Sequence, residues 1–341
     1  MGTDRTYAPA ASGLSVRRRC CAYSLKSIIR QRREREGMDI NAFANKVCNA
    51  VKRELGDDYR VEVKRVRKNN GIVRYGLVIL FREQNVAPTI YLDAYLEAYE
   101  RGSTFGMLVS RLLSAYCGGK PGENVDLEFF RSFDKVQDRI CYRLVGREGN
   151  EELLQDVPHI EFLDLAVCFY YAYQGDMLGE GSILIHNSHV EMWKTCTAEL
   201  LGLAQENTPR LFPWICCSLR EILSQMSGSD GNRMEDGQQE FFWNEVPMKV
   251  LSNAKRIYGA VSMLYPGVLD AVAEKERRSF YILPSSVHEV ILLTDRGEGN
   301  AEAFKQMIVE INATQVAPEE VLSNSLYYYD FAEKKVKMIF C

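Results

Sequence analysis

Residues 160–173, IEFLDLAVCFYYAY, decide the fold of this chain together with a second apolar segment, Ser182-Ile183-Leu184-Ile185. The first stretch is almost continuously apolar and rich in Phe and Tyr, and Gly179 and Gly181 separate it from the second. Buried strands have this composition, and glycines mark the turns between them. The two segments therefore predict an antiparallel hairpin at the centre of a sheet.

Upstream of this hairpin, the spacing of apolar residues changes from helical to strand-like. A helix that ends at Gly56 is expected, because apolar side chains recur there every three or four residues. These side chains are Ile40, Phe43, Val47, Val51 and Leu55. Residues 59–63 then alternate, Asn69-Asn70-Gly71 supplies left-handed turn residues, and residues 72–81 are apolar. This order predicts a β-hairpin.

The rest of the chain alternates short strands with helices. The predicted strands are residues 89–92, 138–145, 248–251, 257–263, 280–283 and 288–293, and a final hairpin runs through Tyr327-Tyr328-Tyr329. The predicted helices are residues 96–99, 104–116, 187–206, 267–275 and 301–312. Hairpins outnumber crossover connections, which favours an α+β fold with mixed, mainly antiparallel sheets and packed helices over a doubly wound sheet.

The chain has 341 residues, which is long for one domain, and a polar break indicates where it divides. Residues 227–240, SGSDGNRMEDGQQE, contain glycines and lack any apolar periodicity. We therefore expect a basic tail over residues 1–37, an N-terminal α+β domain over 38–226, a linker or insertion over 227–245 and a C-terminal α+β domain over 246–341.

The basic tail is expected to be disordered, because it has no sustained apolar pattern. Its last six residues, RREREG, are what purine-rich DNA encodes, and they stand directly before Met38. This resembles a translated bacterial ribosome-binding site, so our hypothesis is that Met38 is the biological start. A targeting segment is the competing interpretation. It lacks an apolar core and a small-residue cleavage site, which argues against secretion.

Charge separates the tail from the body of the chain. Residues 1–37 hold nine Lys and Arg against three Asp and Glu, and the rest holds 33 against 43, within a formal net charge of -4. The body therefore carries a charge of -10. An acidic body repels phosphate backbones, so nucleic-acid binding is not expected unless the tail or a local basic patch provides it.

The short apolar runs and the spacing of the cysteines predict that the protein lies in an aqueous, reducing compartment. No apolar run approaches the eighteen or so residues of a membrane span, since Asp164 interrupts the longest one. The ten cysteines include no Cys-x-x-Cys, which argues against a disulfide framework or a zinc ribbon. Five lie among apolar neighbours and are expected to be small buried hydrophobes: Cys48, Cys117, Cys141, Cys168 and Cys196. We therefore predict a cytoplasmic protein.

Three of the four histidines lie in two short segments at strand ends, 185–191 and 284–289. If these segments meet, His186, His189 and His288 would supply ligands for a divalent metal, with Glu191 or Glu289 as the oxygen donor. The spacing lacks the His-Glu-x-x-His arrangement of metallohydrolases. The simpler interpretation, which we favour, is that Asn187 or Ser188 caps a helix and that the histidines are packing residues.

Other catalytic patterns are weaker. Ser285 or Ser286 beside His288 would need an orienting carboxylate and a Gly-x-Ser-x-Gly turn, and the chain has no such turn. The Pro-Ser-Ser sequence there more often makes the turn between two strands. Glycine-rich phosphate loops of the two common types are also absent from the sequence. Apart from a divalent metal, no cofactor is evident.

Three aromatic triplets are further candidates for contact with a ligand. They are Phe169-Tyr170-Tyr171, Phe241-Phe242-Trp243 and Tyr327-Tyr328-Tyr329. Alternating strand faces bury every second ring in the ordinary case, so core positions are the favoured interpretation. The triplet next to the polar linker is the exception, and we expect it to form a patch that contacts a partner.

Several segments resemble those of an uncharacterised bacterial family, DUF5688, known mainly from gut bacteria. They are residues 69–71, 88–92, 158–160, 183–193, 206–210 and 281–292. They include ILIHNSHVEMW and, continued to Leu293, YILPSSVHEVILL. The resemblance covers nearly the whole chain from Met38 onwards. It implies a cytoplasmic bacterial protein with no established activity, so it supplies no catalytic residue.

The weakness of every catalytic pattern favours a non-enzymatic binding or regulatory protein. Its partner is expected to be a protein or a peptide. The alternative is a hydrolase, metal-dependent or not, that uses His186, His189, Glu191 and His288. These two classes differ in whether loss of His186 abolishes turnover.

Overall fold

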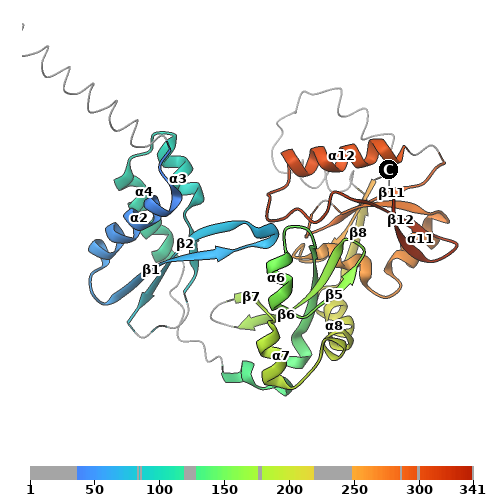
Figure 1. The fold of residues 1–341 in the computed structure, drawn as a ribbon, viewed down its shortest axis with the longest axis horizontal. Coiled ribbons are helices and arrows are strands. Elements are labelled where there is room, and N and C mark those ends of the chain that lie inside the picture. The colour runs from blue at the N-terminus through green and yellow to red at the C-terminus, as the bar shows by residue number, and fades with distance from the viewer. Residues whose placement is uncertain are drawn as a thin grey trace, which may run out of the picture. The chain divides into compact units, whose positions relative to one another are not determined.

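The computed structural model of the protein describes residues 37–82, 84, 87–118, 128–175, 179–218, 248–284, 286–297 and 300–339. The chain divides into two compact units (Figure 1). The first unit comprises Met1–Val66 and Val73–Val125, and the second comprises Arg67–Ile72 and Asp126–Cys341. The tip of the first β-hairpin is therefore counted with the second unit.

This division differs from the predicted one. We expected a boundary in the linker over residues 227–245, which lies outside the described residues. The two strands that flank it, β8 (Trp214–Ser218) and β9 (Met248–Asn253), pair with each other in one sheet. A polar insertion between two paired strands has the composition of a domain linker, and composition alone does not distinguish the two.

The first unit is a three-stranded sheet with helices packed on it (Figure 1). Its elements are α2 (Ile40–Leu55), β1 (Tyr59–Arg67), β2 (Val73–Phe81), β3 (Thr89–Tyr91), α3 (Asp93–Glu100) and α4 (Phe105–Gly118). The carboxylate of Asp39 caps α2 by accepting the N–H of Ala42 at 3.2 Å, and Gly56 ends the helix with φ 79°. The predicted apolar face of α2 is confirmed, because Phe43, Val47 and Val51 are buried.

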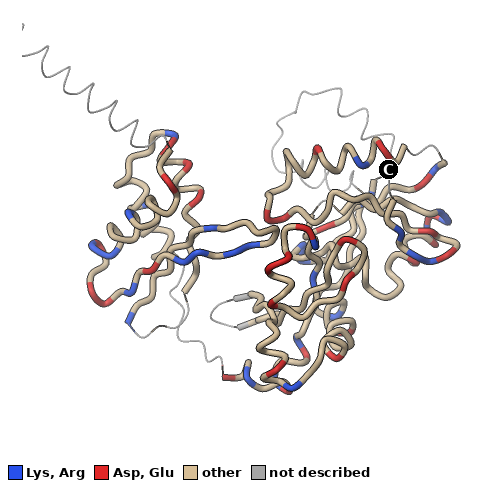
Figure 2. Tube along the Cα trace, viewed as in Figure 1, with Lys and Arg blue, Asp and Glu red and all other residues tan. Residues whose placement is uncertain are grey.

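The strand β1 lies at one edge of this sheet and is strongly basic. Its basic residues are Arg60, Lys64, Arg65 and Arg67. Figure 2 shows Lys and Arg of the chain in blue. Lys64 pairs with the carboxylate of Glu62 at 2.6 Å. Charged side chains on an exposed edge oppose pairing with a strand of another chain.

The second unit contains a four-stranded antiparallel sheet formed by β4 (Ile140–Gly146), β5 (His159–Phe162), β6 (Leu165–Gly175) and β7 (Gly179–Leu184). The strand β6 is central: β4 pairs along one side, and β5 and β7 pair along successive parts of the other. The predicted hairpin of two apolar strands is confirmed. The run over residues 160–173 is itself two strands, because the chain turns at Leu163, where φ is 55°.

A six-stranded sheet completes the second unit, in the order β13-β12-β10-β11-β9-β8. Its further strands are β10 (Phe280–Leu283), β11 (Val290–Thr294), β12 (Leu326–Asp330) and β13 (Lys335–Ile339). One face joins the main core of the unit, and the other packs Met248, Leu283 and Leu293 against Ile308 of α12 (Ala301–Thr314). Hairpins dominate both sheets, and the predicted α+β class is confirmed.

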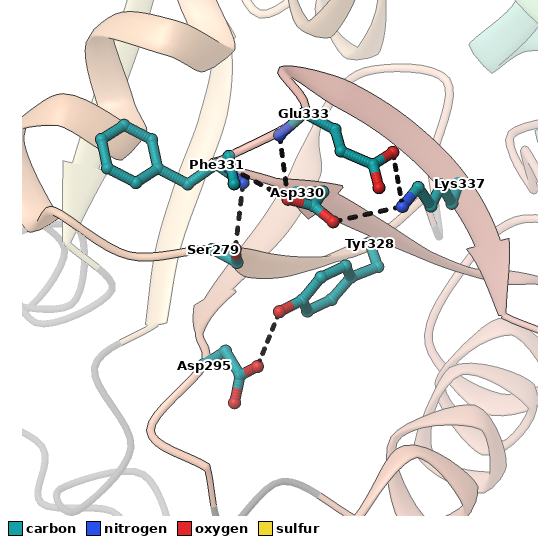
Figure 3. Close-up of polar contacts among 8 residues, drawn as sticks. Ser279, Asp295, Tyr328, Asp330, Phe331, Glu333 and Lys337 are labelled. Carbon is teal, nitrogen blue, oxygen red and sulfur yellow. Dashed lines mark hydrogen bonds and ion pairs between the residues drawn. The ribbon is translucent and has the colours of Figure 1, made fainter.

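The turn between β12 and β13 is closed by polar contacts (Figure 3). The carboxylate of Asp330 accepts the N–H groups of Ala332 and Glu333 at 3.0 and 3.1 Å, and Lys337 Nζ donates to it at 3.1 Å. The backbone donors and Lys337 hold the pKa of Asp330 below its ordinary value. The tyrosines before the turn alternate as predicted: Tyr327 and Tyr329 are buried, and Tyr328 donates to Asp295 at 2.8 Å on the other face.

Some predicted elements were wrong. Residues 187–206 form two helices, α7 (Asn187–Trp193) and α8 (Thr197–Leu211), because Lys194 takes a left-handed conformation with φ 55°. Residues 257–263 were predicted as a strand, but the chain forms the 3-10 helix Gly259–Leu264 there. The left-handed backbone of Tyr258, with φ 52°, turns the chain out of an extended path there.

Two remaining predictions concern cysteines and membranes. Cys48, Cys141 and Cys168 are buried thiols, as predicted, and burial raises the pKa of Cys141 to about 12. Cys117 and Cys196 are exposed, which corrects the prediction for these two. Cys117 stands near the end of α4, and Cys196 precedes the first residue of α8, where side chains reach solvent. Among the described residues, no helix combines the length and the apolarity that crossing a bilayer requires.

Candidate functional site

The first histidine segment joins β7 to α7. His186 occupies the N-cap position, and its backbone N–H donates to Nδ1 of His189 at 3.0 Å. The predicted caps, Asn187 and Ser188, are instead the first residues of the helix, and Nδ2 of Asn187 donates to the carbonyl of Gln155 at 3.0 Å. The two histidines therefore close the start of the helix themselves.

His186 also forms a polar pair that the sequence did not predict. Its Nδ1 lies 2.7 Å from Oδ2 of Asp156, the last residue of α6 (Glu151–Asp156). A carboxylate at Nδ1 favours a proton on that nitrogen. Asp156 is thirty positions away in the chain and belongs to another element, so no local spacing could have indicated it.

His189 lies against the apolar core. Its ring is 5.1 Å from that of Phe130 and 5.7 Å from that of Trp193. Burial lowers the pKa of His189, and His186 beside it acts in the same direction. His189 is therefore held neutral with Nδ1 as an acceptor. Glu191 is exposed on α7.

His288 belongs to a different place in the second unit. Its Nδ1 accepts the N–H of Tyr258 at 3.3 Å, and its Nε2 lies 3.6 Å from Glu320. Ser286 is buried, and its hydroxyl accepts the N–H of His288 at 3.0 Å, which is a turn contact. Ser285 lies outside the described residues, and Glu289 is half-buried.

The three histidines do not assemble into one site. His186 and His189 follow β7 of the four-stranded sheet, whereas His288 precedes β11 of the six-stranded sheet. In the described part of the chain, no group of three or more His, Cys, Asp and Glu side chains is arranged to hold a metal ion. The two segments belong to separate sheets, so no strand pairing brings His288 to the other two histidines.

A polar hollow of about 840 Å³ lies elsewhere in the second unit, beside the hairpin tip. Three of its charged side chains have partners: Arg147 pairs with Glu161 at 2.9 Å, and Asp164 accepts the hydroxyls of Ser323, at 2.5 Å, and of Tyr327. Asn70 lines the hollow and donates to the carbonyl of Val321 at 2.8 Å. These contacts stabilise the fold around the hollow.

A smaller pocket of about 120 Å³ has a different character. Four aromatic rings line it, those of Tyr170, Tyr173, Phe212 and Tyr258. The side chains of Arg139, Lys255 and Ile257 complete its polar and apolar rim. None of the described residues that line it is acidic. Aromatic walls with basic groups are typical of sites that bind an apolar group carrying negative charge.

The aromatic residues of this pocket are positioned by a strand, by the end of a helix and by one turn that contains left-handed residues. Tyr170 comes from β6, and Phe212 follows α8 and has its carbonyl held by the hydroxyl of Tyr265 at 3.1 Å. Tyr258 stands in the turn after β9, where its φ is 52° and that of Arg256 is 53°. Non-glycine residues in this conformation are uncommon and often occur at functional sites.

Arg143 of β4 does not line the pocket, but it contacts one of the lining rings, that of Tyr258. Its guanidinium is 4.8 Å from the centre of the Tyr258 ring, and its Nε is buried without a hydrogen-bond partner. The sequence did not indicate this pocket, because its residues come from the segment before β4, from β6 and β7, from the end of α8 and from the turn after β9. The one unusual feature nearby is Arg143, a charged residue inside an otherwise apolar strand, ICYRLVG.

The comparisons with known proteins agree with the resemblance described above. No curated protein and no solved structure matches the chain. A family model described as a family of unknown function matches residues 40–331. The matched range includes both histidine segments and the aromatic pocket, and it excludes the basic tail. The chain therefore belongs to the family of unknown function DUF5688.

Proposed function

We propose that this protein is a non-enzymatic binding protein of the bacterial cytoplasm, and that it recognises a protein or peptide partner through the aromatic pocket. The observation that carries the proposal is the size of the pocket together with its lining. At about 120 Å³ it is well below the ~300–1,000 Å³ of pockets that enclose whole small molecules. A pocket of this size accommodates one side chain of a larger partner.

The surroundings of the pocket support the same conclusion. Ile257 on its rim is 43% exposed, and Trp214 at the start of β8 is 39% exposed. Trp214 pairs with Asn253 in the neighbouring strand, so it lies close to the turn that carries Ile257. Exposed large apolar residues around a small pocket are typical of the anchor region of a protein interface.

A peptide array probed with the full chain tests this proposal. We expect Ile257→Asp to abolish binding to the peptides that wild-type protein selects, because a charge would enter the apolar rim. Val309→Asp is the matched control, since Val309 is an aliphatic residue of the same unit with 46% exposure on α12. Equal loss in both variants, or none in either, would contradict a role for the pocket.

A hydrolase is the alternative, and one specific observation favours it. The pair of His186 and Asp156 leaves Nε2 of His186 able to act as a general base toward water. Turnover of an ester or phosphoester by the wild-type protein, abolished in His186→Ala, would overturn the proposal of a non-enzymatic protein. We expect no such turnover.

A further inference from the structure

A hydrogen-bonded turn carries the exposed rim of the aromatic pocket. The turn follows β9, and residues 254–257 within it are all exposed. Nδ2 of Asn253, a residue with 1% exposure, donates to the carbonyl of Ile257 at 2.8 Å, and Oδ1 of Asn253 accepts the N–H of Ile257 at 3.3 Å. The N–H of Ala254 donates to the carbonyl of Pro213 at 2.8 Å. These bonds hold both ends of the turn, so no partner is needed to order it.

Two basic residues of this turn stand beside Ile257. Lys255 lines the pocket, and its Nζ lies 5.4 Å from the centre of the Phe212 ring. Arg256 is exposed, has a left-handed backbone with φ 53°, and forms no ion pair with any described residue. Because Ile257 is exposed as well, the turn presents two cations next to an apolar side chain. A polar rim beside an apolar centre is typical of protein interfaces.

A third cation lies on the wall of the pocket. Arg139 lines the pocket and comes from the segment directly before β4. Its Nε donates to the carbonyl of Ala172 at 2.6 Å, and its Nη2 donates to Oε1 of Gln174 at 3.1 Å. These two bonds fix the guanidinium, and no carboxylate among the described residues pairs with it. The remaining N–H groups of Arg139 can therefore donate to a carboxylate from another chain.

The charge of this rim is opposite to that of the protein body. From residue 38 onwards the chain holds 33 Lys and Arg against 43 Asp and Glu, whereas Arg139, Lys255 and Arg256 are all basic. A basic region in an acidic body attracts acidic segments and repels basic ones. It favours a peptide over a nucleic acid, because the charges of a phosphate backbone extend beyond three cations and meet the acidic body.

We propose that the partner is an acidic peptide segment, of which one large apolar side chain enters the aromatic pocket while neighbouring carboxylates pair with Arg139, Lys255 and Arg256. This inference rests on the proposed binding function and names the class of partner. The pocket, at about 120 Å³, has room for one side chain, so the carboxylates lie outside it at the rim. The buried apolar group supplies affinity, and the charge-assisted hydrogen bonds supply specificity.

An array of random nonapeptides probed with the full chain tests the inference. We expect the retained peptides to share a large apolar residue with at least two Asp or Glu residues close to it in sequence. A fluorescein-labelled copy of the strongest retained peptide then serves as the probe for fluorescence anisotropy. Replacement of its acidic residues by the matching amides should weaken binding about tenfold. Unchanged affinity of the amide peptide would overturn the inference.

Charge reversals in the turn test whether the carboxylates meet these residues. We expect Lys255→Glu and Arg256→Glu each to weaken binding of the acidic peptide about tenfold, because like charges would face one another. Lys275→Glu and Arg277→Glu, near the end of α11 (Val268–Glu276), are the matched controls and should change binding little. Both controls are exposed, and Arg277 shares the left-handed conformation of Arg256, with φ 54°. Equal losses in reversals and controls would overturn the inference, because net charge alone would then explain binding.

A double-mutant cycle separates direct pairing from a structural role of the turn. The amide replacements in the peptide should weaken binding to wild type about tenfold and should not weaken binding to Arg256→Glu, since the favourable pair is already lost there. An equal loss in the two proteins would overturn the pairing with Arg256.

The outcomes also separate failure of this inference from failure of the proposed function. Retention of neutral or basic peptides that Ile257→Asp no longer binds would keep the pocket as a peptide site and overturn the acidic partner. Retention of no peptide would overturn both. A labelled single strand of nine thymidines should bind more weakly than the acidic peptide by about tenfold. If it binds more tightly, a nucleic acid replaces the peptide and both proposals are wrong.

Discussion

The two faces of the four-stranded sheet differ in the continuity of their apolar surfaces, because Arg143 lies in the middle of one of them. On the first face, Tyr142 and Leu144 of β4 lie opposite Phe169 and Val167 of β6, and all four belong to the main core. On the second face, Arg143 interrupts the strand and leaves two small apolar clusters, one on each side of it. The first face is continuous, and the second is divided by a charge.

This difference indicates that the two faces of the sheet have different roles. A continuous apolar face contributes stability in proportion to the area that it buries. A charged residue in the same sheet contributes no such hydrophobic stabilisation. When it is buried without a partner, it lowers the stability of the folded protein. We infer that the first face stabilises the second unit and that the second face carries the binding site. The predictions below test that separation.

The largest expected effect is on the first face. Phe169 is fully buried, so Phe169→Ala should destabilise the protein by about 3–5 kcal/mol in urea unfolding, from lost transfer free energy and a cavity. On the second face, Tyr170→Phe retains the ring and should change stability by less than about 1.5 kcal/mol. Similar losses in the two variants would contradict the proposed difference between the faces.

An intermediate effect is expected at Trp193, which belongs to the main core. Its Nε1–H donates to the carbonyl of Phe130 at 2.8 Å, and the side chain is 7% exposed. Trp193→Phe keeps an aromatic ring but leaves a buried acceptor unpaired, so a loss of about 1–3 kcal/mol is expected in urea unfolding. Trp214→Phe is the control on the exposed rim, and it should stay within about 0.5 kcal/mol of wild type.

Much of the fold could be predicted from local patterns. The helix over Ile40–Leu55 and the hairpin of β6 and β7 follow from periods of three to four residues and from a long apolar run. The predicted elements were wrong where the backbone conformation of a single residue determines whether a helix or a strand continues. Lys194 and Tyr258 take left-handed conformations that their side chains do not favour, so the sequence could not show the broken helix or the missing strand.

The candidate site was less accessible to prediction than the fold. The histidines were found because of their rarity, and the structure joins two of them, His186 and His189, through a cap. The third belongs to a segment of another sheet, and sheet membership is set by long-range pairing. The aromatic pocket combines residues from distant elements, and the neighbouring Arg143 has a buried Nε without a hydrogen-bond partner. Which partners a residue lacks depends on the whole fold.

The smallest expected effect concerns pH and involves only the first face. His189 contacts Phe130 and Trp193 of the main core, and burial lowers its pKa in the folded protein, with His186 acting in the same direction and Asp156 opposing them. Above the ordinary histidine pKa of about 6.5, both folded and unfolded chains hold this residue neutral, and its contribution to stability is complete. As the pH falls from that value toward the lowered pKa, the unfolded chain takes up the proton first, so stability decreases.

A non-titrating variant isolates this contribution. His189→Gln should flatten the dependence of the urea midpoint between pH 7.5 and 5.5 relative to wild type, because His186, Asp156 and the other titrating groups remain in both proteins. The protonated imidazole can no longer accept the N–H of His186, which is the physical reason for the loss. Identical slopes in the two proteins would show that His189 is not held neutral by the fold. Peptide binding at pH 7.5 should be the same in both, because the pocket belongs to the second face.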